Sequence, residues 1–193
     1  IYELIDWSVR SNLASILTDC PHREKLGWLE VAHHMQYAMQ YRYQLNGLYS
    51  KVMGDIKDSQ TPEGIVPSIA PEYVRFADGF ENSPEWGSAF IIIPWYIYKW
   101  YGDKSLLSAY YPYMKRYLEY LSTRADDYIV AYGLGDWFDL GPKHPGYSQL
   151  TSNGVTSTGM YYYNATIMSQ IAELLGEEKD EERFTQLAAC IRK

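Results

Sequence analysis

Residues 18–30 read TDCPHREKLGWLE, and this stretch decides how the rest of the chain is interpreted. It brings three carboxylates, an arginine, a histidine and a tryptophan together between two segments with helical periodicity. Pro21 has a fixed φ angle and no amide hydrogen, which suits the first position of a helical turn, and Asp19 before it is a good capping residue. The sequence therefore predicts a capped single turn that Gly27 ends.

The charges in this stretch allow two interpretations. In the first, Arg23 neutralises Asp19 and Glu24 as a solvated pair, because charge clusters are common where helices start. In the second, the stretch is a glycosidase site. A carboxylic acid held against an apolar wall such as Trp28 has its neutral form favoured, so it can protonate a departing glycosidic oxygen. Glu24 is the candidate for that role.

Eight residues of the stretch match, in order, the signature Asp-Cys-Pro-x-Arg-(Asp/Glu)-x-(x)-Leu-Gly-Trp: Asp19, Cys20, Pro21, Arg23, Glu24, Leu26, Gly27 and Trp28. The stretch thereby resembles glycoside hydrolase family 78, the α-L-rhamnosidases. The resemblance implies a six-fold α/α barrel in which Glu24 is the general acid and Asp19 holds sugar hydroxyls. It also assigns Arg23 and Trp28 to the substrate-binding site.

Two positions depart from the family pattern. Family members usually follow the tryptophan with x-Gly-Asp, whereas this chain has Glu30 and then Val31, and we expect Glu30 to compensate. Members also commonly show Trp-x-Asp-Ala, whereas Trp86 is followed by Gly-Ser-Ala. Trp86 is assigned to sugar binding by this resemblance, while Glu85 is expected to point elsewhere on the helix.

A third candidate segment is the Gly-Asp-Trp at residues 135–137. The carboxylate of Asp136 can accept hydrogen bonds from sugar hydroxyls while the indole of Trp137 packs on the apolar face of a sugar ring. A turn with a buried tryptophan is the structural alternative. The match to the Gly-Asp-Trp of family 78 favours substrate binding by both residues.

Composition limits the classes of function. The chain has 193 residues, 47% of them hydrophobic, which suits one globular domain over residues 1–193. The net charge of −7 argues against a nucleic-acid partner, and no apolar run is long enough to span a bilayer. Cys20 and Cys190 are expected to be free thiols. His33 and His34 lack a metal-binding pattern, so neither a metal nor a cofactor is expected.

Apolar spacing predicts an all-α fold with about seven helices, joined alternately by short turns and long loops. Pro112 is expected to kink or split the helix that contains it. The predicted helices cover residues 1–17, 29–43, 48–60, 84–101, 104–124, 159–175 and 180–191.

A family 78 barrel needs twelve helices, so the chain is expected to be an incomplete barrel. It lacks an initiator Met and a signal segment, and it is interpreted as excised from a longer parent. The remaining barrel helices and accessory domains of that parent are expected partners. The general base is expected beyond Lys193. The isolated chain is expected to self-associate and to be poorly active.

The predicted function is inverting hydrolysis of terminal α-L-rhamnosyl bonds in a rhamnose-containing glycan. The alternative is a non-catalytic carbohydrate-binding or scaffold module that has lost catalytic aspartates. A helical repeat protein that binds other proteins is disfavoured because no fixed repeat period is present. The sequence assigns no compartment; analogy favours a periplasmic or secreted bacterial protein, and a cytoplasmic location stays open.

Overall fold

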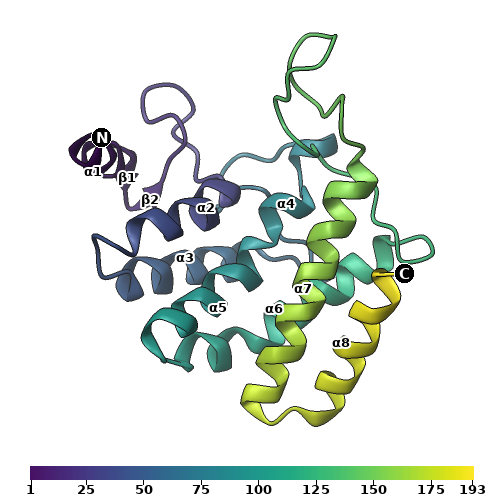
Figure 1. Cartoon of the computed structure of the whole chain (residues 1–193). Coiled ribbons are helices and arrows are strands. Elements are labelled where there is room, and N and C mark those ends of the chain that lie inside the picture. The colour runs from purple at the N-terminus through teal and green to yellow at the C-terminus, as the bar shows by residue number, and fades with distance from the viewer.

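The computed structural model describes all of residues 1–193, and the predicted all-α class is confirmed (Figure 1). A single two-stranded hairpin and one short 3-10 helix accompany the α-helices. The elements are α1 Tyr2–Asn12, β1 Leu13–Ala14, β2 Ile16–Leu17, α2 Leu29–Met39, α3 Asn46–Ser59, η1 Asp78–Phe80, α4 Pro84–Gly87, α5 Ala89–Tyr101, α6 Ser105–Arg124, α7 Asn153–Leu175 and α8 Glu178–Ile191.

The first predicted helix is wrong over its last five residues. Helix α1 ends at Asn12, and β1 and β2 then form a tight antiparallel hairpin with Leu13 opposite Leu17. Ser15, at the tip of the hairpin, has φ of 72°, a left-handed conformation that an α-helix cannot contain. The apolar spacing of this segment therefore reflects a hairpin that follows a shorter helix.

Helix α2 ends at Met39, four residues before the predicted end, and two helices in the middle of the chain also differ from expectation. The predicted 84–101 helix is two segments, α4 and α5, which Ser88 separates. Helix α6 runs without a break through Pro112, so the expected split is wrong. Its buried face, which includes Leu107, Met114 and Leu118, packs in the core and holds the helix together despite the missing amide donor.

The loop before α7 is shorter than predicted. Helix α7 begins at Asn153, six residues before the expected start, because the carbonyl of Ser152 accepts hydrogen bonds from the amides of Val155 and Thr156. The remaining connection, residues 125–152, still lacks helix; its first part lies near the C-terminus of the chain, and its later part projects past the start of α7 (Figure 1).

The helices form three hairpins arranged in two layers. Helix α5 contacts α2 on one side and α7 on the other, while α3 and α6 contact each other and pack against α5. Helix α8 packs along α7 (Figure 1). Alternation of one helix in each layer is the pattern of an α/α barrel, and these three hairpins amount to half of a six-hairpin barrel.

Helix α5 is the centre of the core. Its residues from Ala89 to Ile93 are all buried and belong to a cluster of 37 buried hydrophobic residues. This helix has the most apolar sequence in the chain, yet neither it nor any other helix has both the length and the apolar character needed to cross a membrane.

An extended segment fixes the end of the signature to the body of the fold. The amide of Leu29 donates to the carbonyl of Ser68, and the amide of Ala70 donates to the carbonyl of Gly27, each at 3.0 Å. A Cβ atom added at Gly27 would lie 2.6 Å from the carbonyl oxygen of Ala70. Glycine is therefore required here by close backbone approach.

Replacing Gly27 by Ala is expected to lower the free energy of unfolding by about 1–3 kcal/mol, the usual cost of forcing an atom into a packed interior. Gly47→Ala is the matched control, because a Cβ atom there meets nothing within 4 Å. Thermal unfolding of both variants checks the prediction. An unchanged midpoint for Gly27→Ala would contradict the close packing.

Candidate active site

The signature forms a single turn that is not α-helical. The carbonyl of Cys20 accepts hydrogen bonds from the amides of Arg23 and Lys25, and Lys25 has φ of 58°. The left-handed residue that ends the turn is thus Lys25, so the prediction that Gly27 ends it is wrong. Gly27 instead begins the extended segment that pairs with residues 68–70.

Glu24 is held at both carboxyl oxygens. Arg23 Nη2 donates to Oε1 at 2.8 Å, and the indole Nε1 of Trp28 donates to Oε2 at 2.6 Å. The side chain of Glu24 is 27% exposed. Trp28 therefore contacts Glu24 through the polar N–H edge of its indole. The expectation that Trp28 forms an apolar wall for this carboxyl is wrong.

Asp19 lies beside Glu24. A carboxylate oxygen of Asp19, the sulfur of Cys20 and a carboxylate oxygen of Glu24 all lie within 4.8 Å of one another. Arg23 forms its ion pair with Glu24 and none with Asp19, so the interpretation in which Arg23 neutralises both carboxylates holds for only one of them. Asp19 is exposed at the surface of the turn.

A cluster of aromatic rings joins the signature to the loop before α7. The ring of Trp28 stacks on Phe76 with centroids 5.3 Å apart and contacts Phe80 at 6.2 Å. Phe80 in turn meets Trp137 edge-on at 4.9 Å. Trp137 also contacts Tyr147. Two tryptophans from distant parts of the sequence, 28 and 137, are therefore bridged by one phenylalanine ring.

A cavity of about 590 Å³ lies beside this cluster, where the first turns of α2, α4 and α7 meet. It brings together four of the predicted site residues; Asp19, Arg23, Glu24 and Trp28 are not among the residues that line it. The lining residues are Glu30, His33, His34, Glu85, Trp86, Gly135, Asp136, Trp137, Val155, Thr156, Gly159 and Met160.

Glu30 lies in the cavity wall, near enough to Asp19 of the signature for the two charges to interact. Burial raises the pKa of its carboxyl, and the nearby negative charge of Asp19 raises it further, while His34 opposes both effects. The Nε2 atom of His34 lies 3.3 Å from Oε1 of Glu30, one helical turn away. Burial thus holds the pKa of Glu30, at the wall of the cavity, above that of an exposed glutamate.

Asp136 and Trp137 are placed by a strained loop. Gly133 has φ of 101°, and a Cβ atom there would lie 2.5 Å from Oγ of Ser83, so only glycine fits. Asn153 at the start of α7 donates to the carbonyl of Gly133 at 2.8 Å. The helix start and the loop therefore fix each other.

Trp86 and Trp137 present different surfaces to the cavity. Trp86 is only 6% exposed and offers little of its ring, whereas Trp137 is half-buried. Trp137 is therefore not the buried turn residue that the structural alternative predicted.

The sequence prediction missed several residues of the cavity wall, including Glu85 and His33. Glu85 lines the same cavity as Trp86, so the expectation that it points elsewhere on the helix is wrong. His33 is buried, and its Nε2 lies 3.1 Å from the carbonyl oxygen of Glu85. Because a carbonyl only accepts, Nε2 carries the hydrogen. The Ser-Pro-Glu start of α4 was the available signal for Glu85; no sequence signal indicated the contact of His33.

Burial, together with the neighbouring His34, lowers the pKa of His33 to about 4. His33 is therefore neutral at pH 7, and it joins α2 to α4 through one hydrogen bond. The ring centroids of His33 and His34 are 4.2 Å apart, and each histidine has a hydrogen-bonding or ion-pair partner of its own.

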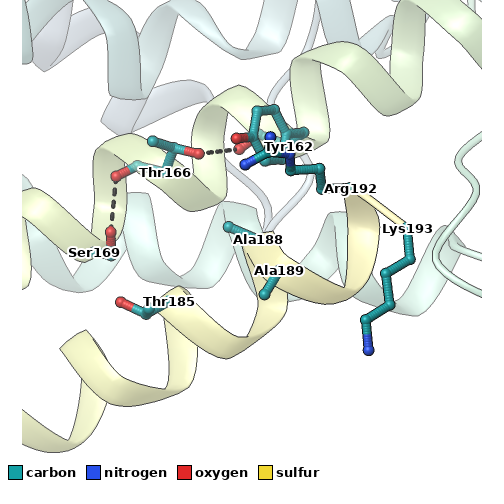
Figure 2. Close-up of a pocket in the computed structure, with 8 residues that line it drawn as sticks. All are labelled: Tyr162, Thr166, Ser169, Thr185, Ala188, Ala189, Arg192 and Lys193. Atoms are coloured by element: carbon teal, nitrogen blue, oxygen red, sulfur yellow. Dashed lines mark hydrogen bonds between the residues drawn. The ribbon is translucent and has the colours of Figure 1, made fainter.

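A second hollow, of about 470 Å³, lies between α7 and α8 near the chain's end (Figure 2). Small side chains such as Ser169 and Ala188 line it, and Thr166 and Ser169 direct their hydroxyls to backbone carbonyls of α7. None of the predicted site residues lies there. It offers neither a carboxylate nor a tryptophan to a sugar.

The chain is similar to known glycosidases over its whole length. Residues 1–193 match the family model of the bacterial alpha-L-rhamnosidase six-hairpin glycosidase domain. A curated alpha-L-rhamnosidase of Formosa agariphila is 34% identical over 146 residues, which cover 71% of this chain and 15% of that protein.

Two solved structures are similar in fold. The alpha-L-rhamnosidase of Dictyoglumus thermophilum superposes with a TM-score of 0.87 at 37% identity, over 97% of this chain and 21% of that one. The Streptomyces avermitilis alpha-L-rhamnosidase complexed with L-rhamnose gives a TM-score of 0.83 at 29% identity, over 97% of this chain and 17% of that one. The chain thus spans between 15 and 21% of the length of these relatives.

Proposed function

Because the chain belongs to the bacterial alpha-L-rhamnosidase six-hairpin glycosidase family, we propose that it forms half of the catalytic barrel of an enzyme that hydrolyses terminal α-L-rhamnosyl bonds. The observation that carries the proposal is the meeting of the start of α2, which follows the signature, with the start of α4 and the Gly-Asp-Trp loop around one cavity of about 590 Å³ that carboxyl groups and tryptophans line. A related structure was solved with L-rhamnose bound.

The proposed reaction inverts the configuration at the anomeric carbon. Glu24 donates a proton to the glycosidic oxygen as its bond to the sugar breaks. A water molecule attacks from the opposite face, and a second carboxylate accepts its proton. Such carboxyl pairs stand about 6.5–9.5 Å apart to leave room for the water. The second carboxylate is proposed to come from outside residues 1–193.

The remaining site residues are proposed to bind the rhamnosyl group. Asp19, Glu30 and Asp136 offer carboxylate oxygens to sugar hydroxyls, since ionised carboxylates only accept hydrogen bonds. Trp137 offers a ring to the apolar face of the sugar, and Trp86 forms part of the cavity wall. Arg23 and Trp28 hold Glu24 in place, through the hydrogen bonds that they donate to its two oxygens.

Hydrolysis of an aryl α-L-rhamnoside by the longer protein that contains this chain tests the proposal. We expect release of L-rhamnose, with the β-anomer formed first when the reaction is followed by NMR. Release of the α-anomer would contradict inversion. Binding of L-rhamnose without hydrolysis would support the alternative, a non-catalytic carbohydrate-binding module.

The isolated 193-residue chain is expected to be inactive on the same substrate and to self-associate. Half of a barrel leaves apolar side chains of its inner helices exposed, such as Tyr37 and Val155. In the longer protein, the remaining helices are proposed to cover these and the hollow between α7 and α8. Light scattering and the aryl rhamnoside assay check the prediction; an active, monodisperse monomer would contradict it.

A further inference from the structure

The side chain of Glu85 is placed in the cavity by three separate elements. Ser83 Oγ donates to Oε2 of Glu85 at 2.7 Å, and Ser157 Oγ of α7 lies 3.0 Å from Oε1. His33 of α2 donates to the backbone carbonyl of Glu85. Ser83 also accepts a hydrogen bond from the amide of Leu134, which ties it to the Gly-Asp-Trp loop. The orientation of Glu85 is thus set from α2, α7 and the loop together.

The carboxylate of Glu85 keeps acceptor capacity that no group of the chain uses. Its two oxygens offer about four lone-pair sites, and only serine hydroxyls occupy them. Ser157 has a single hydroxyl hydrogen, and the carbonyl of Tyr132 competes for it at 2.8 Å. No lysine, arginine or histidine forms an ion pair with Glu85. Hydroxyl donors of a bound ligand can fill these sites.

Ser88 cannot accept a hydrogen bond from a ligand in the cavity. It is fully buried, its Oγ donates to the carbonyl of Pro84, and it accepts a hydrogen bond from Nδ2 of Asn164 at 2.8 Å. Ser88 therefore joins α4 and α5 to α7 and is not part of the cavity wall. The carboxylate at this part of the wall is supplied by Glu85, three residues earlier.

We propose that Glu85 binds a hydroxyl group of the sugar in this cavity. This inference rests on the proposed function, because it takes the ligand of the cavity to be a rhamnosyl group. The ligand chemistry is a pyranose with adjacent hydroxyls: Glu85 of α4, Glu30 of α2 and Asp136 of the loop before α7 contribute acceptors to the wall, and Trp137 adds an apolar surface.

The test compares Glu85→Gln with Glu81→Gln in the longer protein that contains this chain. Glu81 is an exposed glutamate outside the cavity wall and is the matched control. Removal of a hydrogen bond to a charged acceptor is expected to weaken binding of L-rhamnose about 10- to 100-fold for Glu85→Gln. Calorimetric titration with L-rhamnose measures this, and the control is expected to match the unsubstituted protein. Equal affinity of all three proteins would overturn the inference.

Deoxy sugars separate direct contact from a structural effect. If Glu85 accepts from one hydroxyl, the penalty of Glu85→Gln disappears for the 2-, 3- or 4-deoxy-L-rhamnose that lacks it, and persists for the other two. An equal penalty for all three would show that Glu85 acts only through the fold. If Glu85→Gln fails to fold, Glu85→Asp replaces it, because aspartate keeps the charge on a shorter side chain. Its affinities for L-rhamnose and the three deoxy sugars are then compared in the same way.

The hydrolysis assay keeps this inference distinct from the proposed function. An unsubstituted protein that binds L-rhamnose but hydrolyses no rhamnoside would overturn the proposed function, while the titration still decides the role of Glu85. A hydrolytic protein whose Glu85→Gln variant binds L-rhamnose normally would overturn only the inference about Glu85.

Discussion

Replacing Glu24 by Gln in the longer protein is expected to lower kcat about 10²- to 10⁴-fold, the usual contribution of a general acid. Gln keeps the shape of the side chain and one carbonyl oxygen that can accept from Arg23 or Trp28, so binding of L-rhamnose should stay nearly intact. Steady-state kinetics and titration with L-rhamnose measure the two effects. Glu119→Gln, at an exposed ion pair with Arg183, is the matched control.

The leaving group decides whether Glu24 is the proton donor. A dinitrophenolate leaves without protonation, whereas an alkoxide requires it. The loss caused by Glu24→Gln should therefore be small for a dinitrophenyl rhamnoside and large for an alkyl rhamnoside. Glu30→Gln is the informative comparison, because Glu30 lines the cavity and burial raises the pKa of its carboxyl. If only Glu30→Gln shows this dependence, the role of acid belongs to Glu30.

Acidification from pH 6.5 to pH 4 is expected to cost about 3 kcal/mol of folding stability through His33 alone. Burial lowers the pKa of folded His33 to about 4, whereas the unfolded chain protonates near the ordinary value of 6.5. Between these values the unfolded state binds more protons, so stability rises with pH. The contribution of His33 is complete above pH 6.5 and is lost as the pH falls through 4.

Thermal unfolding at pH 4.5 and pH 7 tests this prediction in the longer protein. His33→Gln should remove most of the difference attributed to His33, since glutamine can still donate to the carbonyl of Glu85 but does not titrate. His144→Gln is the control, because His144 is exposed in the loop before α7. A pH dependence that is identical in His33→Gln and in the unsubstituted protein would contradict the assignment.

Much of the fold follows from local sequence. Apolar spacing indicated most of the helices, and the Ser-Pro-Glu at residues 83–85 correctly located the start of α4. Backbone geometry outweighs periodicity at the hairpin around Ser15 and at the early start of α7. The opposite error occurred in α6, which stays unbroken through Pro112 as its periodicity indicated. At Pro112, packing of the buried face outweighs the local preference of one residue.

The site residues likewise fall into two groups: those that a local motif indicated and those that only the tertiary structure revealed. Motifs within single stretches identified the signature, Trp86 and the Gly-Asp-Trp loop, because each motif is contiguous. The sequence could not show that Trp28 and Trp137 share a contact with Phe80, or that Glu85 lines the cavity. These contacts join residues that are tens of positions apart.

The amino-acid sequence alone determined the helical class, the family resemblance and the chemical types of the site residues. Tertiary structure alone decided which carboxylates share the cavity. Glu30, Glu85 and Asp136 line it, while Glu24 lies at the signature turn, bound to Arg23 and Trp28. The physical reason is that a residue's own stretch sets its backbone, whereas the direction of its side chain depends on partners such as Ser157 and His33, which other helices supply.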